Sequence, residues 1–149
     1  MMDMKVLNAV APRYYPVIAG LLEIALGFFG IYICLLQMVA IGGRLPPSPF
    51  IVGGLIASYL GLVGGLSSLL KRYHKLGILG AYAMFVWFGS LFCIQLISNI
   101  ALSGAPFAAN TFPSTSIEFI EYVAVFIILL LTPSFLSSIL IRKSIAEFV

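Results

Sequence analysis

VIAGLLEIALGFFGIYICLLQMVAI (Val17–Ile41) is an apolar run of about 25 residues whose strongly polar members are Glu23 and Gln37. A helix rises about 1.5 Å per residue, so roughly 20 such residues span the ~30 Å hydrocarbon core of a bilayer. The run is also longer than the apolar region of a signal peptide, which has roughly 7–15 residues. It therefore predicts a transmembrane helix and favours a chain without a cleaved leader.

Three further apolar runs of similar length follow the first one. Helices are the expected form for all of them, because a helix satisfies its own backbone hydrogen bonds in lipid. The short alternating segments of a membrane β-barrel are absent from the sequence. The connections between the runs are short, which favours antiparallel neighbours. We predict an all-α membrane protein with a single four-span domain over residues 1–149. Its fold is expected to be an up-down-up-down four-helix bundle with helices at about 17–41, 51–70, 76–102 and 119–141.

Composition supports lipid as the solvent of this chain. The sequence is 62% hydrophobic and 9% charged, whereas soluble domains average roughly 45–50% apolar and about 25% charged residues. The net charge of +3 does not indicate nucleic-acid binding, because the basic residues lie at the ends of the apolar runs and form no patch. The two cysteines fit neither a disulfide framework nor a zinc site. With no nucleotide-binding or catalytic motif either, we predict no cofactor, no metal ion and no catalytic residue.

The distribution of lysine and arginine predicts the orientation of the chain. Cytoplasmic loops of membrane proteins carry an excess of these residues. With four spans, Arg44 falls on one side of the membrane and seven basic residues fall on the other: Lys5, Arg13, Lys71, Arg72, Lys75, Arg142 and Lys143. We therefore expect both termini in the cytoplasm. The stretch YPVIAGLLEIALGFFGI (residues 15–31), followed by a glycine-rich run that ends in LLKRYHKLGILG (residues 69–80), resembles small four-span membrane proteins of prokaryotes. This resemblance implies a prokaryotic plasma membrane.

Small and polar residues form a narrow stripe along the first predicted helix. They recur at spacings of 3, 4, 3, 4 and 3: Gly20, Glu23, Gly27, Gly30, Cys34 and Gln37. Such a period places them on one face, where small residues permit close packing against another helix. The same face could instead be a polar seam that lines a conduit or a ligand site, and both interpretations remain open. The second run has small residues at a strict interval of four, Gly53, Ala57, Gly61 and Gly65. This spacing predicts a close helix contact, with a partner in the same chain favoured over dimerisation.

The acidic residues near or inside the spans are candidate functional residues. Glu23 lies about 10 Å from the cytoplasmic end of its predicted helix, where an ionised carboxylate costs about 2.5–3.5 kcal/mol on insertion scales. It should point inward and be protonated, hydrogen-bonded or helped by Arg13 or Arg72, and the alternative is a role in proton or cation handling. Glu118 and Glu121 are expected at the outer mouth of the fourth helix. Solvation and an ion pair with Arg44 are favoured there over cation binding.

Two other features of the third and fourth runs carry expectations. Gln95 and Asn99 are one helical turn apart near the outer end of the third run, where they could hydrogen-bond to a neighbouring helix. Thr132-Pro133 is expected to kink the fourth helix, because proline lacks a backbone donor and crowds the preceding turn.

The predicted function is that of a non-catalytic structural or accessory subunit of a larger integral membrane complex, of which a respiratory or other energy-converting assembly is one type. The expected partners are other membrane protein subunits and lipids, and not nucleic acid. The reason is that nearly all of the sequence is apolar span and that no cofactor ligands are present. The alternative is a small homo-oligomeric channel or transporter that uses Glu23 and the polar stripe of the first helix.

Overall fold

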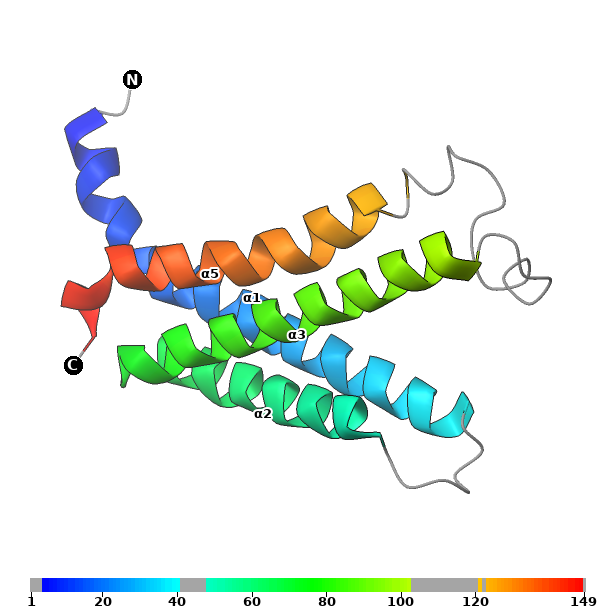
Figure 1. Ribbon diagram of the computed structural model, residues 1–149. Coiled ribbons are helices and arrows are strands. Elements are labelled where there is room, and N and C mark those ends of the chain that lie inside the picture. Colours follow the sequence, from blue (N-terminus) through cyan, green and yellow to red (C-terminus); the bar gives the residue numbers. More distant parts are fainter. Residues whose placement is uncertain (1–3, 41–47, 103–120, 122, 149) are drawn as a thin grey trace.

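The protein is built from long helices, as the computed structural model shows (Figure 1). The structure describes residues 4–40, 48–102, 121 and 123–148, and this part of the chain contains helices and no strand. Helices α1 (Met4–Ala40), α2 (Pro49–Leu69) and α3 (His74–Leu102) are followed by a composite helix. The composite helix comprises residues 123–126, the π-helix η2 (Ile127–Leu131) and α5 (Thr132–Lys143), and the short 3₁₀ helix η3 (Ile145–Glu147) comes after it.

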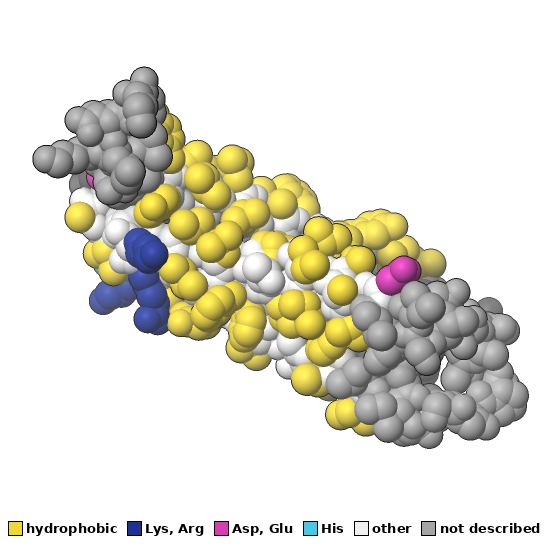
Figure 2. Space-filling model, turned by 90° about the horizontal axis from the view of Figure 1, so that it is seen from above, with side chains coloured by type: hydrophobic (Ala, Val, Ile, Leu, Met, Phe, Trp, Pro, Cys, Tyr) yellow, Lys and Arg dark blue, Asp and Glu magenta, His cyan; other side chains and the backbone are white. Residues whose placement is uncertain are grey.

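The described residues contain four helices that are long and apolar enough to cross a membrane: Arg13–Val39, Pro49–Leu69, His74–Ile94 and Val123–Lys143. Their outward side chains are apolar; Phe28, Val86 and Ile128 are each more than 60% exposed. Figure 2 shows hydrophobic side chains over most of the described flank of the molecule, with lysine and arginine gathered at one end. A surface of this kind suits hydrocarbon and not water. The prediction of an all-helical, multi-pass membrane protein is therefore confirmed.

The helices pack as a bundle in which α1 and α3 each contact both α2 and α5. Figure 1 shows both chain ends at the end of the molecule where α2 turns into α3. The half of the bundle near the start of α2 has an aromatic core, with the rings of Trp87 and Phe88 5.0 Å apart and Phe126 edge-on to Phe88. In the other half the three helices α1, α2 and α3 meet through glycines, serines and Glu23.

The boundaries of α2 and α3 lie within two residues of the predicted ones, whereas α1 starts at Met4 and not near Val17. Figure 1 shows the first turns of α1 bent away from the rest of the helix. Pro12 and Pro16 belong to this part of the sequence, and each lacks the backbone donor that an inner helical turn uses. The hydropathy of the first run marks only the apolar part of α1, because backbone hydrogen bonding continues into the polar edge of a membrane helix. The predicted start of the fourth helix at Phe119 lies outside the described residues.

The irregularity expected at Thr132-Pro133 takes the form of a π-turn. Ile127–Leu131 is a π-helix, and the backbone N–H of Thr132 bonds to the carbonyl of Ile127 in the wider π pattern. Pro133 follows this π-turn directly, and the backbone is helical on both sides of the junction. Proline supplies no backbone N–H to the helix, and a π-turn is one of the irregularities that accompany such a position.

Candidate functional site

Glu23 is the most unusual side chain in the interior of the bundle. It is 0% exposed, and neither carboxylate oxygen has a hydrogen-bond partner among the described residues. It lies ten residues after Arg13, roughly 15 Å along α1. Neither the expected hydrogen bond nor the expected help from Arg13 or Arg72 is found in the described part of the chain. In this part of the chain the recorded ion pair joins Lys71 to Glu147 instead. A buried charge without a partner costs several kcal/mol, so this environment destabilises an ionised carboxylate.

The space for the Glu23 carboxyl group is created by two glycines. A Cβ atom on Gly64 of α2 would lie 2.7 Å from Oε2 of Glu23, and one on Gly80 of α3 would lie 3.1 Å from the same oxygen. The two glycines also face each other, since the Gly64 Cβ would lie 3.2 Å from the Cα of Gly80. Any larger side chain at either position would occupy the place of the carboxyl group. The Glu23 side chain therefore fills a cradle formed by the backbones of α2 and α3.

The stripe predicted on α1 faces the interior of the bundle. Gly20, Glu23, Gly27, Gly30 and Cys34 are buried, and Gln37 at the end of the stripe is partly exposed. A Cβ on Gly20 would lie 2.6 Å from the carbonyl oxygen of Gly65, and one on Gly65 would lie 2.7 Å from the carbonyl oxygen of Gly20. Farther along, the Cys34 thiol lies 3.7 Å from the carbonyl oxygen of Ile51. The backbones of α1 and α2 thus approach closely along the stripe.

The four-residue series on α2 divides between two surroundings. Ala57, Gly61 and Gly65 are buried, with Gly65 against α1 and Gly61 against Met84 of α3. Gly53 is exposed, and a Cβ placed on it would meet no atom within 4 Å. The first member of the series therefore faces away from the helix contacts within this chain.

Several buried polar groups near the site were not singled out by the sequence pattern. Ser58 and Ser68 of α2 are 0% exposed and their hydroxyls lack partners in the described part of the chain. On α5 the buried serines bond to their own helix, and Ser137 also donates a hydrogen bond to the carbonyl of Ala19 on α1 at 3.5 Å. The helical spacing of four serines could have indicated the buried face of α5: Ser134, Ser137, Ser138 and Ser144. The buried positions on α2 and α3 are harder to recognise from the sequence, because these helices contain further glycines and serines: Ser58, Ser68, Gly64 and Gly80.

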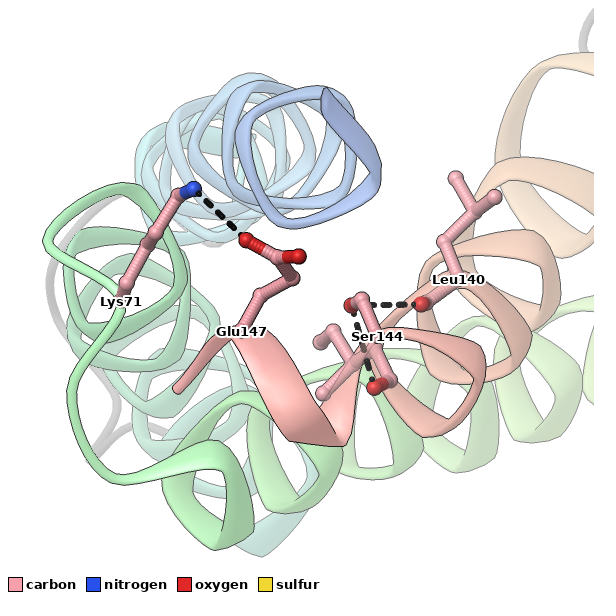
Figure 3. Close-up of polar contacts among 5 residues, drawn as sticks. Lys71, Leu140, Ser144 and Glu147 are labelled. Atoms are coloured by element: carbon pink, nitrogen blue, oxygen red, sulfur yellow. Dashed lines mark hydrogen bonds and ion pairs between the residues drawn. The ribbon is translucent and has the colours of Figure 1, made fainter. Parts of the chain in front are cut away.

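The polar residues predicted at the outer end are described only in part. Glu121 is exposed, and its expected partner Arg44 and its neighbour Glu118 lie outside the described residues. Gln95 and Asn99 belong to α3, and their side chains also lie outside the described part. At the opposite end, Lys71 Nζ lies 3.4 Å from Glu147 Oε2, an ion pair between the α2–α3 turn and η3 that Figure 3 shows. No pattern in the sequence predicted this pair.

Two hollows open on the surface of the described bundle. A groove of about 470 Å³ lies between α2 and α3 and has an almost wholly apolar lining that includes Gly53, Ala57, Tyr82, Ala83 and Trp87. A cavity of about 310 Å³ lies where α1, α3 and the fourth helix meet, and it is lined by Phe29, Gln37, Phe126 and other residues. Glu23 lines neither of them.

The described residues bring no three histidine, cysteine, aspartate or glutamate side chains together as metal ligands. The chemistry available at the three-helix contact is that of one carboxyl group among backbone carbonyls and two serine hydroxyls. Comparisons with protein-family models, with curated protein sequences and with solved structures gave no match to this chain.

Proposed function

We propose that this chain is a non-catalytic structural subunit of a larger integral membrane complex, in which it binds helices of other subunits and lipid. The observation that carries the proposal is the open groove between α2 and α3. The small residues Gly53, Ala57 and Ala83 belong to its lining, and a Cβ on Gly53 would meet no atom within 4 Å. In membranes small residues of this kind let the backbone of a second helix approach closely.

The rest of the outer surface fits the same role. The described exterior between the two ends is dominated by exposed leucine, isoleucine, valine and aromatic side chains. Such side chains can contact lipid or the helices of a partner but offer little for chemistry in water. An energy-converting assembly is one type of complex that would hold a subunit of this form.

We further propose an up-down-up-down arrangement with both termini in the cytoplasm of a prokaryotic cell. Both chain termini lie at the same end of the bundle as the α2–α3 turn, and this supports the arrangement (Figure 1). The excess of lysine and arginine at that end supports the orientation, because cytoplasmic segments carry such an excess.

Substitution of Gly53 tests the proposed subunit role. Gly53→Trp should place a large side chain in the groove, and its Cβ would meet no atom of its own chain within 4 Å. We expect this variant to fold and to be lost from the complex. The measurement is extraction from the native membrane in a gentle detergent, followed by native electrophoresis and identification of the polypeptides that migrate together.

Val52→Trp is the matched control, since Val52 is an exposed neighbour on α2 that does not line the groove. This control should remain in the complex. If the unmodified chain migrates alone, or only with copies of itself, the proposed role as a subunit is wrong.

A second candidate function is a small homo-oligomeric channel or transporter, and the buried Glu23 without a partner is the observation that favours it. Against it, the carboxyl group lies in a closely packed cradle and lines neither of the two hollows described above. Glu23→Gln in reconstituted vesicles separates the two functions. Loss of ion flux with unchanged assembly would favour the channel or transporter.

A further inference from the structure

We propose that Glu23 is a buried proton-binding site at the contact of α1, α2 and α3. In this site its carboxyl group is the neutral acid and lies near main-chain carbonyl oxygens of α2 and α3, which disfavour a carboxylate. The inference goes beyond the role of the chain as a subunit and does not depend on it.

Main-chain carbonyl oxygens lie beside the positions that face the Glu23 carboxyl group. The Gly64 position that faces Oε2 of Glu23 also faces the carbonyl oxygen of Leu76, at 2.8 Å from an added Cβ. The Gly80 position likewise faces the carbonyl oxygen of Leu60, at 2.6 Å. A carbonyl oxygen has two lone pairs, so one already used within a helix can accept a second hydrogen bond. A carboxylate offers no donor to these acceptors, whereas a neutral carboxyl group offers one.

The cradle has little room beside the carboxyl group. Added Cβ atoms at Gly64 and Gly80 would lie 2.7 and 3.1 Å from the same carboxylate oxygen, so α2 and α3 both pack closely against it. A bound metal cation needs several oxygen ligands and room for itself. The described residues around Glu23 leave space for a proton, which adds no volume.

No counter-charge lies against the Glu23 carboxyl group among the described residues. The positions that face its Oε2 are Gly64 of α2 and Gly80 of α3, and its oxygens take part in no ion pair or hydrogen bond with the described part of the chain. The described basic side chains are partly or fully exposed, and Lys71 and Arg142 already contact Glu147 and Tyr82. The ring of His74, at the start of α3, meets the ring of Phe148 edge-on, with the centroids 5.9 Å apart. A proton is thus the positive charge that can neutralise Glu23 in this packing.

The two buried hydroxyls differ from the carboxyl group in one respect. A serine in a helix can rotate its hydroxyl towards the carbonyl four residues earlier, so Ser58 and Ser68 can form a hydrogen bond within α2. Along α2, Ser68 is roughly 6 Å and Ser58 roughly 9 Å from the level of Gly64. These distances are too long for either hydroxyl to connect Glu23 to water by a continuous chain of hydrogen bonds. The site is therefore closed in this conformation, and its proton should exchange slowly with water.

Infrared spectroscopy of the full-length protein in lipid at neutral pH tests the proposal. A neutral carboxylic acid has a carbonyl stretching band separate from the bands of carboxylates and amides, and the band moves to lower frequency in D₂O. We expect the band in the unmodified protein, with a slow shift in D₂O. Glu23→Gln, which keeps the shape of the side chain, should abolish it. Glu121→Gln, which changes an exposed acid at the far end, should leave it intact.

The proposal is overturned if the unmodified protein lacks the band at neutral pH or if Glu23→Gln retains it. If the variant does not fold, carbon-13 labelling of glutamate in the unmodified chain assigns the band to a glutamate, because the band must then shift without any substitution. Glu118→Gln, Glu121→Gln and Glu147→Gln, which should each leave the band intact, then assign it to Glu23. Sodium chloride is compared with choline chloride in the same samples. A band lost with sodium alone would assign a metal cation to the site and would also overturn the proposal.

Discussion

Gly20 and Gly65 illustrate how single glycines determine the spacing of α1 and α2. Each would place a Cβ within 2.7 Å of the other's carbonyl oxygen, a distance at which backbone would have to move. Gly53, on the same helix as Gly65, has no neighbour within 4 Å. Glycine thus has two different roles on α2, and the difference lies in what the missing side chain would touch.

Gly20→Ala is expected to destabilise the bundle, because the added methyl group pushes α1 away from α2. Overpacking of this kind typically costs about 1–3 kcal/mol. Gly53→Ala is the matched control and should cause no loss, since alanine has the better helix propensity. Reversible unfolding in mixed detergent micelles measures both variants. Equal stability of the two would contradict the close contact between Gly20 and Gly65.

At the scale of the elements, α5 is attached to the bundle by a serine-rich face. Ser134, Ser137, Ser138 and Ser144 are buried, and each hydroxyl bonds to a carbonyl of its own helix (Figure 3 shows Ser144). Serine is small and satisfies its own hydroxyl in this way, so it allows α5 to approach α1 without an unpaired polar group. The helix is additionally joined to α3 by the bond from Arg142 to the hydroxyl of Tyr82, at 2.9 Å.

Ser137→Leu should weaken the attachment of α5, because Ser137 faces the carbonyl of Ala19 on α1 and a larger side chain has no room there. The expected loss is about 1–3 kcal/mol of unfolding free energy. Ser137→Ala keeps the volume and should change the stability little, since the 3.5 Å bond to Ala19 is long. The same micelle unfolding assay compares the two. A larger loss for Ser137→Ala than for Ser137→Leu would show that the hydroxyl, and not its size, holds α5.

Lys71 and Glu147 tie the C-terminal η3 to the α2–α3 turn, but this pair contributes little to stability. The two side chains are 28% and 37% exposed, and ion pairs with that access to water are typically worth about 0–1 kcal/mol. The pair matters more for the position of η3 at the basic end of the bundle.

For the whole molecule, length and hydropathy were enough to predict four spanning helices, because the thickness of a bilayer imposes both. The periodicity of α1 also predicted which of its faces is small and polar. The residues that contact that face could not be predicted, because the sequence pattern of a single helix does not determine its rotation and register against another helix. Glu23 shows the difference: its position on the inner stripe was evident, whereas its cradle at Gly64 and Gly80 required three helices in place.

The membrane topology of the whole chain is tested most directly by single cysteines introduced at Arg44 and at Lys75. A membrane-impermeant maleimide reacts with a thiol in water and not with one inside a bilayer, where the thiolate does not form. The unmodified chain controls for Cys34, which is buried, and for Cys93. We predict that Arg44→Cys is labelled on intact cells, and that Lys75→Cys is labelled only after the membrane is permeabilised. Labelling of both positions from the same side would contradict four spans with the basic ends in the cytoplasm.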